Sequence, residues 1–151
     1  MGNICRSPLA EAIFNHQILE KRLQKHFLAN SCGTANYHIG DPPDPRTIRN
    51  ALKNGISIQH QGRQFDPQDF QRYDQILTMD RSNQVNLLRL PGAGAYNHKV
   101  KLMRVFDLVN KGADVPDPYY GNEIDFQDVF DILQRSVSGL VRSLQADIKA
   151  S

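Results

Sequence analysis

The first eight residues of the chain, MGNICRSP, have the composition of an anion-binding loop that leads into a helix. Gly2 allows the backbone to approach an anion closely. Ser7 is a good helix cap, and Pro8 suits the first helical position because it has no N–H to leave unpaired. Backbone N–H groups ahead of a helix attract anions, and the planar fork of Arg6 can hold two phosphate oxygens. The stretch therefore predicts a phosphate site.

A second group of chemically capable residues is DPYYG, at positions 117–121. Asp117 lies on a proline-stiffened loop beside Tyr119 and Tyr120. A carboxylic acid in this setting can protonate the phenolate that leaves when an aryl phosphate is cleaved, and the two rings can line a slot for a flat substrate. Alone, the pentapeptide is more typical of a surface turn with packed tyrosines than of a catalytic loop.

The sequence between these two groups predicts helices that alternate with strands. Apolar residues at helical spacing are clearest over residues 126–144, where they continue for five turns. Alternating helices and strands favour a three-layer α/β sandwich with a parallel sheet flanked by helices, whose sites lie at the carboxyl ends of the strands. Helices are predicted over residues 8–25, 44–55, 66–67 (one turn), 80–90 and 126–144, strands over 27–32, 73–79 and 99–106, and loops over 40–45 and 114–121.

Composition narrows the class of protein. A chain of 151 residues fits one domain, 1–151, with a real core. The formal charge of +2 is too small to imply nucleic acid, and no apolar run reaches membrane-spanning length. Cys5 and Cys32 form neither a disulfide framework nor a zinc site. We therefore expect a cytoplasmic protein without a nucleic-acid or membrane partner.

The residues from Gly2 to Pro8 resemble the signature loop of the low-molecular-weight protein tyrosine phosphatases, in which a Cys is followed by five residues, an Arg and a Ser. Further segments are similar to that family in order and spacing, and a long helix follows the last of them: SCGT at 31–34, YHIGDPPD at 37–44, TMDRSN at 78–83 and DPYYG at 117–121. The resemblance implies the fold of this family and hydrolysis of phosphotyrosine or small aryl phosphates through a phosphocysteine, with no metal or cofactor.

The resemblance also implies a role for each matching position. Arg6 would bind the phosphoryl oxygens, and Asp117 would act as general acid and then as the base that activates water. Ser7 would hydrogen-bond the nucleophile's sulfur. On its own, His60 indicates only a surface or capped histidine. Phosphate or substrate would further be bound by Met1, Gly2, Asn3, Ile4, Cys5, Tyr37, Tyr119 and Tyr120, and the loop would be supported by Asn3, Ser31, His60 and Asp80.

The chain departs from the family pattern at its start. The nucleophilic Cys and the first strand would stand immediately before Met1. The sixth residue after Cys5 is Glu11, and the sixth after Cys32 is His38, so no Cys-x5-Arg is present. Because Arg6 is adjacent to Cys5, Cys5 is not expected to replace the nucleophile, and Cys32 is expected to be a small buried apolar residue.

Two interpretations of this start compete. In one, the protein begins upstream of Met1 and is a phosphatase. In the other, the chain is a phosphate- or phosphoprotein-binding pseudophosphatase with inorganic phosphate or a similar oxyanion in its loop. An arsenate reductase on the same fold ranks last, because it needs further cysteines and the C-terminal half has none. Without the nucleophilic Cys, we expect impaired catalysis. Without the first strand, we expect a destabilised domain and self-association through exposed sheet edges.

Overall fold

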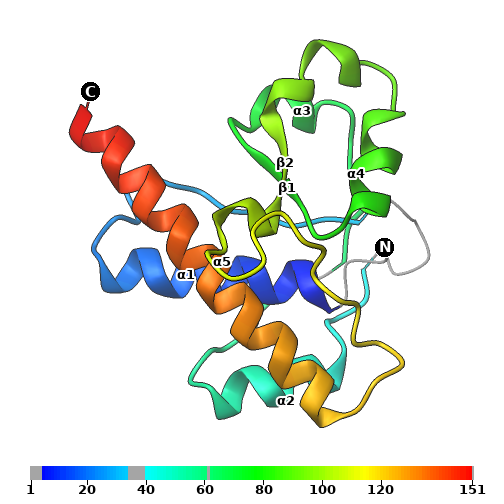
Figure 1. The fold of residues 1–151 in the computed structure, drawn as a ribbon, viewed down its shortest axis with the longest axis vertical. Coiled ribbons are helices and arrows are strands. Elements are labelled where there is room, and N and C mark those ends of the chain that lie inside the picture. Colours follow the sequence, from blue (N-terminus) through cyan, green and yellow to red (C-terminus); the bar gives the residue numbers. More distant parts are fainter. Residues whose placement is uncertain (1–4, 34–39, 61, 151) are drawn as a thin grey trace.

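Helices and strands alternate along much of this computed structural model, which describes residues 5–33, 40–60 and 62–150 (Figure 1). Three short 3-10 segments, η1 to η3, lie between the fourth and fifth helices. The bounds are α1 Arg6–Glu20, α2 Pro45–Lys53, α3 Asp69–Arg72, β1 Ile76–Thr78, α4 Arg81–Leu88, η1 Ala93–Ala95, η2 Asn97–Lys99, β2 Val100–Leu102, η3 Met103–Phe106 and α5 Glu123–Ala150.

The sheet separates two helical layers. Strands β1 and β2 pair in parallel, with Leu77 opposite Lys101. Ile76 and Val100 pack into a cluster with side chains of α3 and α4, whereas Leu77 packs against the cluster formed by α1 and α5. Successive residues of a strand point to opposite faces, so the two faces of the sheet are covered by different helices. The predicted parallel sheet flanked by helices is therefore confirmed.

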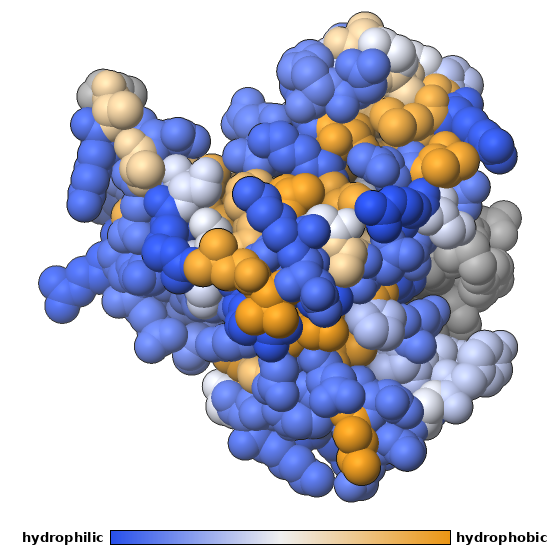
Figure 2. Space-filling model, viewed as in Figure 1, coloured by the Kyte–Doolittle hydropathy of each residue, from blue (hydrophilic) through white to orange (hydrophobic). Residues whose placement is uncertain are grey.

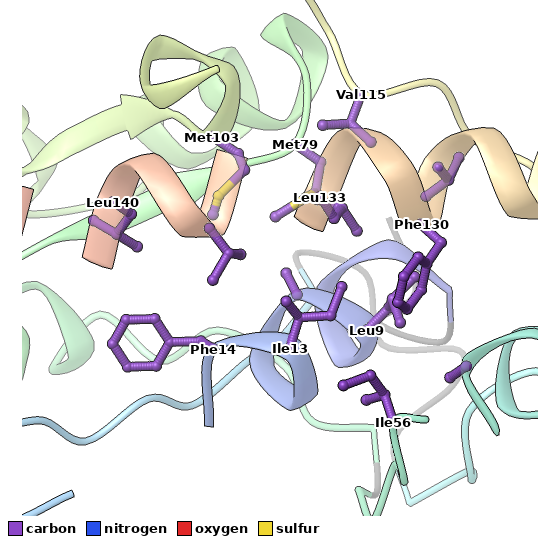
Figure 3. Close-up of a cluster of buried hydrophobic side chains, with 14 of the residues drawn as sticks. Leu9, Ile13, Phe14, Ile56, Met79, Met103, Val115, Phe130, Leu133 and Leu140 are labelled. Carbon is purple, nitrogen blue, oxygen red and sulfur yellow. The ribbon is translucent and has the colours of Figure 1, made fainter. Parts of the chain in front are cut away.

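The larger core lies between α1 and α5, which cross each other below the sheet (Figures 1 and 3). In Figure 3, Ile13 of α1 faces Leu133 of α5, and both side chains are fully buried. Met79 and Met103 reach this core from the ends of β1 and β2. The three-and-four spacing of apolar residues in α5 explains why one stripe of this long helix is buried while the opposite side is exposed.

One predicted strand is wrong. Residues 27–32 adopt no strand, and within the described residues only an isolated bridge, Gly33 to Gln64, follows them. A cavity of about 500 Å³ lies between this segment and β1, with Phe14, Leu77 and Val137 among its walls. A strand needs a neighbouring strand for its backbone hydrogen bonds, and on the side of β1 this segment borders the cavity instead.

Several predicted boundaries also shift. Helix α1 is capped by Cys5 without a side-chain hydrogen bond, so Ser7 lies inside the helix and is not its cap. Pro8 is tolerated there because N–H groups of a first turn have no intrahelical partner. By contrast, Asp44 caps α2 as expected, accepting a hydrogen bond from the Arg46 N–H at 2.9 Å. Both strands are shorter than predicted, and β2 turns directly into η3.

The surface in Figure 2 is mostly hydrophilic, with apolar residues in small groups. Among the described residues, the most exposed large apolar side chains include Leu28, Leu108 and Tyr120. No helix in the described ranges has both the length and the apolar character that crossing a membrane requires.

Candidate active site

Arg6, the first residue of α1, joins three segments of the chain. Its side chain is only 6% exposed, and its Nη1 donates to Oδ2 of Asp80 and to the carbonyl of Val115, each at 2.7 Å. Its Nη2 lies 4.0 Å from Oδ2 of Asp117. A buried guanidinium held by two charge-assisted hydrogen bonds has little rotational freedom. The start of α1, the start of α4 and the loop with Asp117 therefore meet at one cation.

Asp80 balances the charge of Arg6 and also begins α4. Its Oδ1 accepts a hydrogen bond from the Asn83 N–H at 2.7 Å, which caps the helix. Burial would raise the pKa of Asp80, but the hydrogen bonds from Asn83 and Arg6 outweigh it and lower the pKa. The carboxylate therefore stays ionised behind Arg6.

Asp117 is the accessible acid of this site. Half of its side chain is exposed (52%), and its Oδ1 accepts a hydrogen bond from the Tyr119 N–H at 3.1 Å. The other carboxylate oxygen faces Arg6. Arg6 and Asp117, one from each of the two groups that the sequence analysis singled out, therefore lie side by side.

The rings beside this acid form an exposed wall. Tyr119 and Tyr120 contact each other edge to face, with centroids 5.0 Å apart. Tyr120 is 96% exposed, whereas Tyr119 is partly covered by the guanidinium of Arg46, 5.4 Å from its centroid. Tyr37, the third predicted wall residue, lies outside the described residues, as do Met1, Gly2, Asn3 and Ile4.

The loop that carries Asp117 is held by residues that the sequence analysis did not assign. The Val115 N–H donates to the Met79 carbonyl at 2.7 Å, and Arg104 Nη1 donates to the Asp114 carbonyl at 3.0 Å. Arg104 is buried and paired with Asp107 at 3.1 Å. A charged residue at an inward position of a predicted strand was the only signal that could have identified it.

Cys5 lacks the properties of a nucleophile. Its side chain is buried, and its Sγ lies 3.9 Å from Oδ2 of Asp44. Burial first, and then the negative charges of Asp44 and Asp117, raise the pKa of Cys5 to about 11. Only a thiolate attacks phosphorus efficiently, and this thiol is protonated at neutral pH. Burial similarly raises the pKa of Cys32, which is half-buried, to about 11.

The remaining predicted supports lie near α1. Ser7 is half-buried in the first turn of that helix, and Ser31 is buried. The His60 side chain is also covered, with its Nδ1 3.6 Å from Oε1 of Glu11. The sequence analysis gave no role to Glu11, which lies in α1. In the described ranges no three His, Cys, Asp or Glu side chains are grouped as metal ligands.

Comparison with known proteins decides the family. The family model for low molecular weight phosphotyrosine protein phosphatases matches residues 1–150. The chain belongs to this family.

Individual members of the low molecular weight phosphatase family are similar over most of the chain. A relative from Synechocystis sp. is 43% identical over 150 residues, covering 98% of this chain and 94% of the relative. The low molecular weight phosphotyrosine protein phosphatase of Schizosaccharomyces pombe is 39% identical over 133 residues, or 86% and 83% of the two chains. The crystal structure of a protein tyrosine phosphatase from Entamoeba histolytica, with Hepes in its active site, superposes with a TM-score of 0.91 at 36% identity, covering 97% and 94%.

Proposed function

We propose that this chain binds phosphotyrosine-containing proteins or small aryl phosphates at Arg6. We further propose that it hydrolyses them when a cysteine nucleophile directly precedes Met1. The observation that carries the proposal is the 4.0 Å separation between Arg6 Nη2 and the Asp117 carboxylate at the N-terminal end of α1. A cation for phosphoryl oxygens beside an accessible acid for the leaving phenolate is the arrangement that aryl phosphate cleavage needs. Membership of the phosphatase family supports the same reaction.

Each residue has a separate part in the proposed reaction. Arg6 stabilises the charge on the equatorial phosphoryl oxygens, while Asp80 and the Val115 carbonyl keep its guanidinium in place. Asp117 donates a proton to the phenolate oxygen and then takes one from the water that hydrolyses the phosphocysteine. The rings of Tyr37, Tyr119 and Tyr120 line the sides of the substrate slot. Met1, Gly2, Asn3, Ile4, Cys5 and Ser7 complete the phosphate loop, and Ser31 and His60 support it.

The nucleophile decides how much activity the 151 residues have by themselves. No Cys-x5-Arg occurs in them, and the Cys5 thiol is buried with a raised pKa. Loss of a nucleophile in other hydrolases leaves only a small residual rate. We therefore expect phosphate binding with hydrolysis slower by roughly 10³-fold or more than in the same chain preceded by an apolar strand ending in Cys.

The test compares these two polypeptides with p-nitrophenyl phosphate as substrate and with inorganic phosphate as ligand. The proposal predicts that both bind phosphate and that only the extended chain turns over rapidly. Equal, rapid turnover by the 151 residues would show that our assignment of the nucleophile is wrong. Binding by both without turnover by either would favour the pseudophosphatase.

The cavity between residues 27–32 and β1 favours one further proposal, which is self-association. β1 pairs with β2 on one side, and on its other side the described residues leave a cavity in place of a strand. Unpaired strand edges attract strands of other chains. We expect the 151-residue chain to form dimers or larger species in sedimentation velocity experiments at micromolar concentration. A monodisperse monomer at all concentrations would contradict this.

We also place the protein in the cytoplasm as a proposal. Both cysteines are free thiols, as is usual in a reducing compartment. Cell fractionation that recovers the protein outside the cytoplasm would contradict this placement.

A further inference from the structure

A buried carboxylate, Asp44, lies beside the proposed phosphate site. The residue is 8% exposed, and its Oδ2 is 3.9 Å from the sulfur of Cys5, the residue that precedes Arg6. The negative charges of Asp44 and Asp117 both contribute to the raised pKa of Cys5, so both carboxylates act electrostatically on this sulfur. The hydrogen bond from Arg46 lowers the pKa of Asp44, which is therefore ionised at neutral pH. An uncompensated negative charge here would repel a phosphate dianion.

Arg46 compensates that charge through two contacts. Its Nη2 lies 2.7 Å from Oδ2 of Asp44, and its Nε lies 3.1 Å from Oδ1, the fork geometry that matches a carboxylate. The backbone N–H of Arg46 donates to the same carboxylate as the cap of α2. The position of the charge is therefore set by the helix start itself.

Two aromatic rings fix the guanidinium in this position. Its carbon lies 4.7 Å from the ring centroid of Phe126, in the first turn of α5, and 5.4 Å from that of Tyr119. A cation over aromatic faces gains energy from the ring quadrupoles. Arg46 thus connects α2 and α5 with the loop that carries Asp117, two residues before Tyr119.

We propose that Arg46 is a positioning residue for the phosphate site: it neutralises Asp44 and holds Tyr119 against the substrate slot. This inference rests on the proposed function, since it assumes that the anion binds beside Cys5 and Arg6. It adds a requirement that the phosphate loop by itself does not impose. The affinity for phosphate then also depends on the Asp44–Arg46 ion pair, which lies at the start of α2 and outside the phosphate loop.

The test is a double-mutant cycle on the Asp44–Arg46 pair. Isothermal titration calorimetry at pH 8 measures the affinity of each variant for inorganic phosphate. Arg46→Met keeps an apolar stem between the rings but removes the charge, and we expect phosphate affinity to fall about tenfold. Asp44→Asn keeps a good helix cap and is expected to bind phosphate at least as tightly as the unaltered chain. In the double variant Asp44→Asn/Arg46→Met, the affinity should return to within about threefold of the unaltered chain, because neither charge remains.

The controls separate charge from structure. Lys53→Met removes the same charge from an exposed position in the last turn of α2 and should leave phosphate affinity unchanged. Arg46→Lys keeps the charge but loses the fork to Asp44 and the stacking on the rings, so its phosphate affinity should lie between those of the unaltered chain and Arg46→Met. Should Arg46→Met fail to fold, phosphate affinity in Arg46→Lys equal to that of the unaltered chain would contradict the inference.

Two results would overturn the inference. If Arg46→Met bound phosphate normally, Arg46 would have no influence on the site. If the double variant bound phosphate as weakly as Arg46→Met, Arg46 would act through the local structure and not through the neutralisation of Asp44. Failure of the unaltered chain to bind phosphate would instead overturn the proposed function, and this inference with it.

Discussion

At the scale of single residues, Arg6 and Asp117 divide the proposed chemistry between them. Arg6 is buried and fixed by Asp80 and the Val115 carbonyl, so it can bind an oxyanion without first becoming ordered. Asp117 is half exposed, and it can exchange protons with water between the two steps. Binding and proton transfer should therefore respond separately to substitution.

Asp117→Asn tests this separation. The amide keeps the shape of the side chain but cannot donate the proton that a phenolate requires, so kcat should fall by about 10²- to 10⁴-fold. The affinity for inorganic phosphate should change little, since Arg6 is untouched. Both quantities are measured in the chain that carries the strand and Cys before Met1.

Asp114→Asn is the matched control. Asp114 lies on the same loop, and its Oδ1 accepts a hydrogen bond from the Arg81 N–H at 3.0 Å. Its carboxylate has no contact with Arg6 in the described residues, so kcat should be nearly unchanged. An equal loss of kcat in both variants would show that loop structure, and not acid catalysis, explains the effect.

At the scale of elements, the packing of α5 against η3 sets the position of the loop that carries Asp117. Gly139 of α5 approaches the backbone of η3 so closely that an added Cβ would overlap the Phe106 carbonyl oxygen. Immediately after η3, the buried Asp107 accepts hydrogen bonds from Arg104 and from Arg135 of α5. The helix, the 3-10 segment and the beginning of the loop are therefore one packed unit.

Gly139→Ala should disrupt this unit. Because the nearest atom is backbone and cannot rotate away, α5 or η3 must move, at a cost of about 1–3 kcal/mol in the free energy of unfolding. Urea denaturation followed by circular dichroism measures the change. Ser143→Ala, at an exposed position one turn later in α5, should have no such effect. Equal stability of the two variants would contradict the close approach.

Local sequence patterns correctly located those elements that form from residues close together in the chain. The apolar spacing of residues 126–144 located α5, and Asp44 followed by Pro45 located the start of α2. The pattern of residues 27–32 predicted a strand because it records only apolar character, whereas pairing depends on a neighbour distant in sequence. Arg104 and Arg46 were missed for the same reason: their partners come from other elements.

At the scale of the whole molecule, three buried or partly buried carboxylates link stability to pH. Burial alone would raise the pKa of Asp107, but hydrogen bonds from Arg135 and the Val109 N–H lower it. Asp44 and Asp80 also have lowered pKa values, through Arg46 and through Asn83 with Arg6. A lowered native pKa adds stability above the unfolded value of about 3.9, and this stability is lost as the pH falls through the native value.

Acid unfolding should therefore begin below about pH 4 and depend on Asp107. Asp107→Asn leaves Arg104 and Arg135 without their carboxylate, which should cost about 3–5 kcal/mol at pH 7 and flatten the decline in stability below pH 4. Chemical denaturation at a series of pH values measures both effects. The exposed Asp131→Asn should show neither. An unchanged pH profile for Asp107→Asn would contradict the assignment.

The loop that carries Asp117 is attached to α5 at both of its ends. Asp107 is bound to Arg135, and at the other end the Asn122 N–H donates to the carboxylate of Asp125 in the first turn of the helix. These two contacts hold the ends of the loop in a fixed position relative to α5. Under the proposed function, a phosphotyrosine has to reach Asp117 between these fixed ends, so we expect phosphotyrosines on flexible segments to be hydrolysed faster than those buried in folded domains.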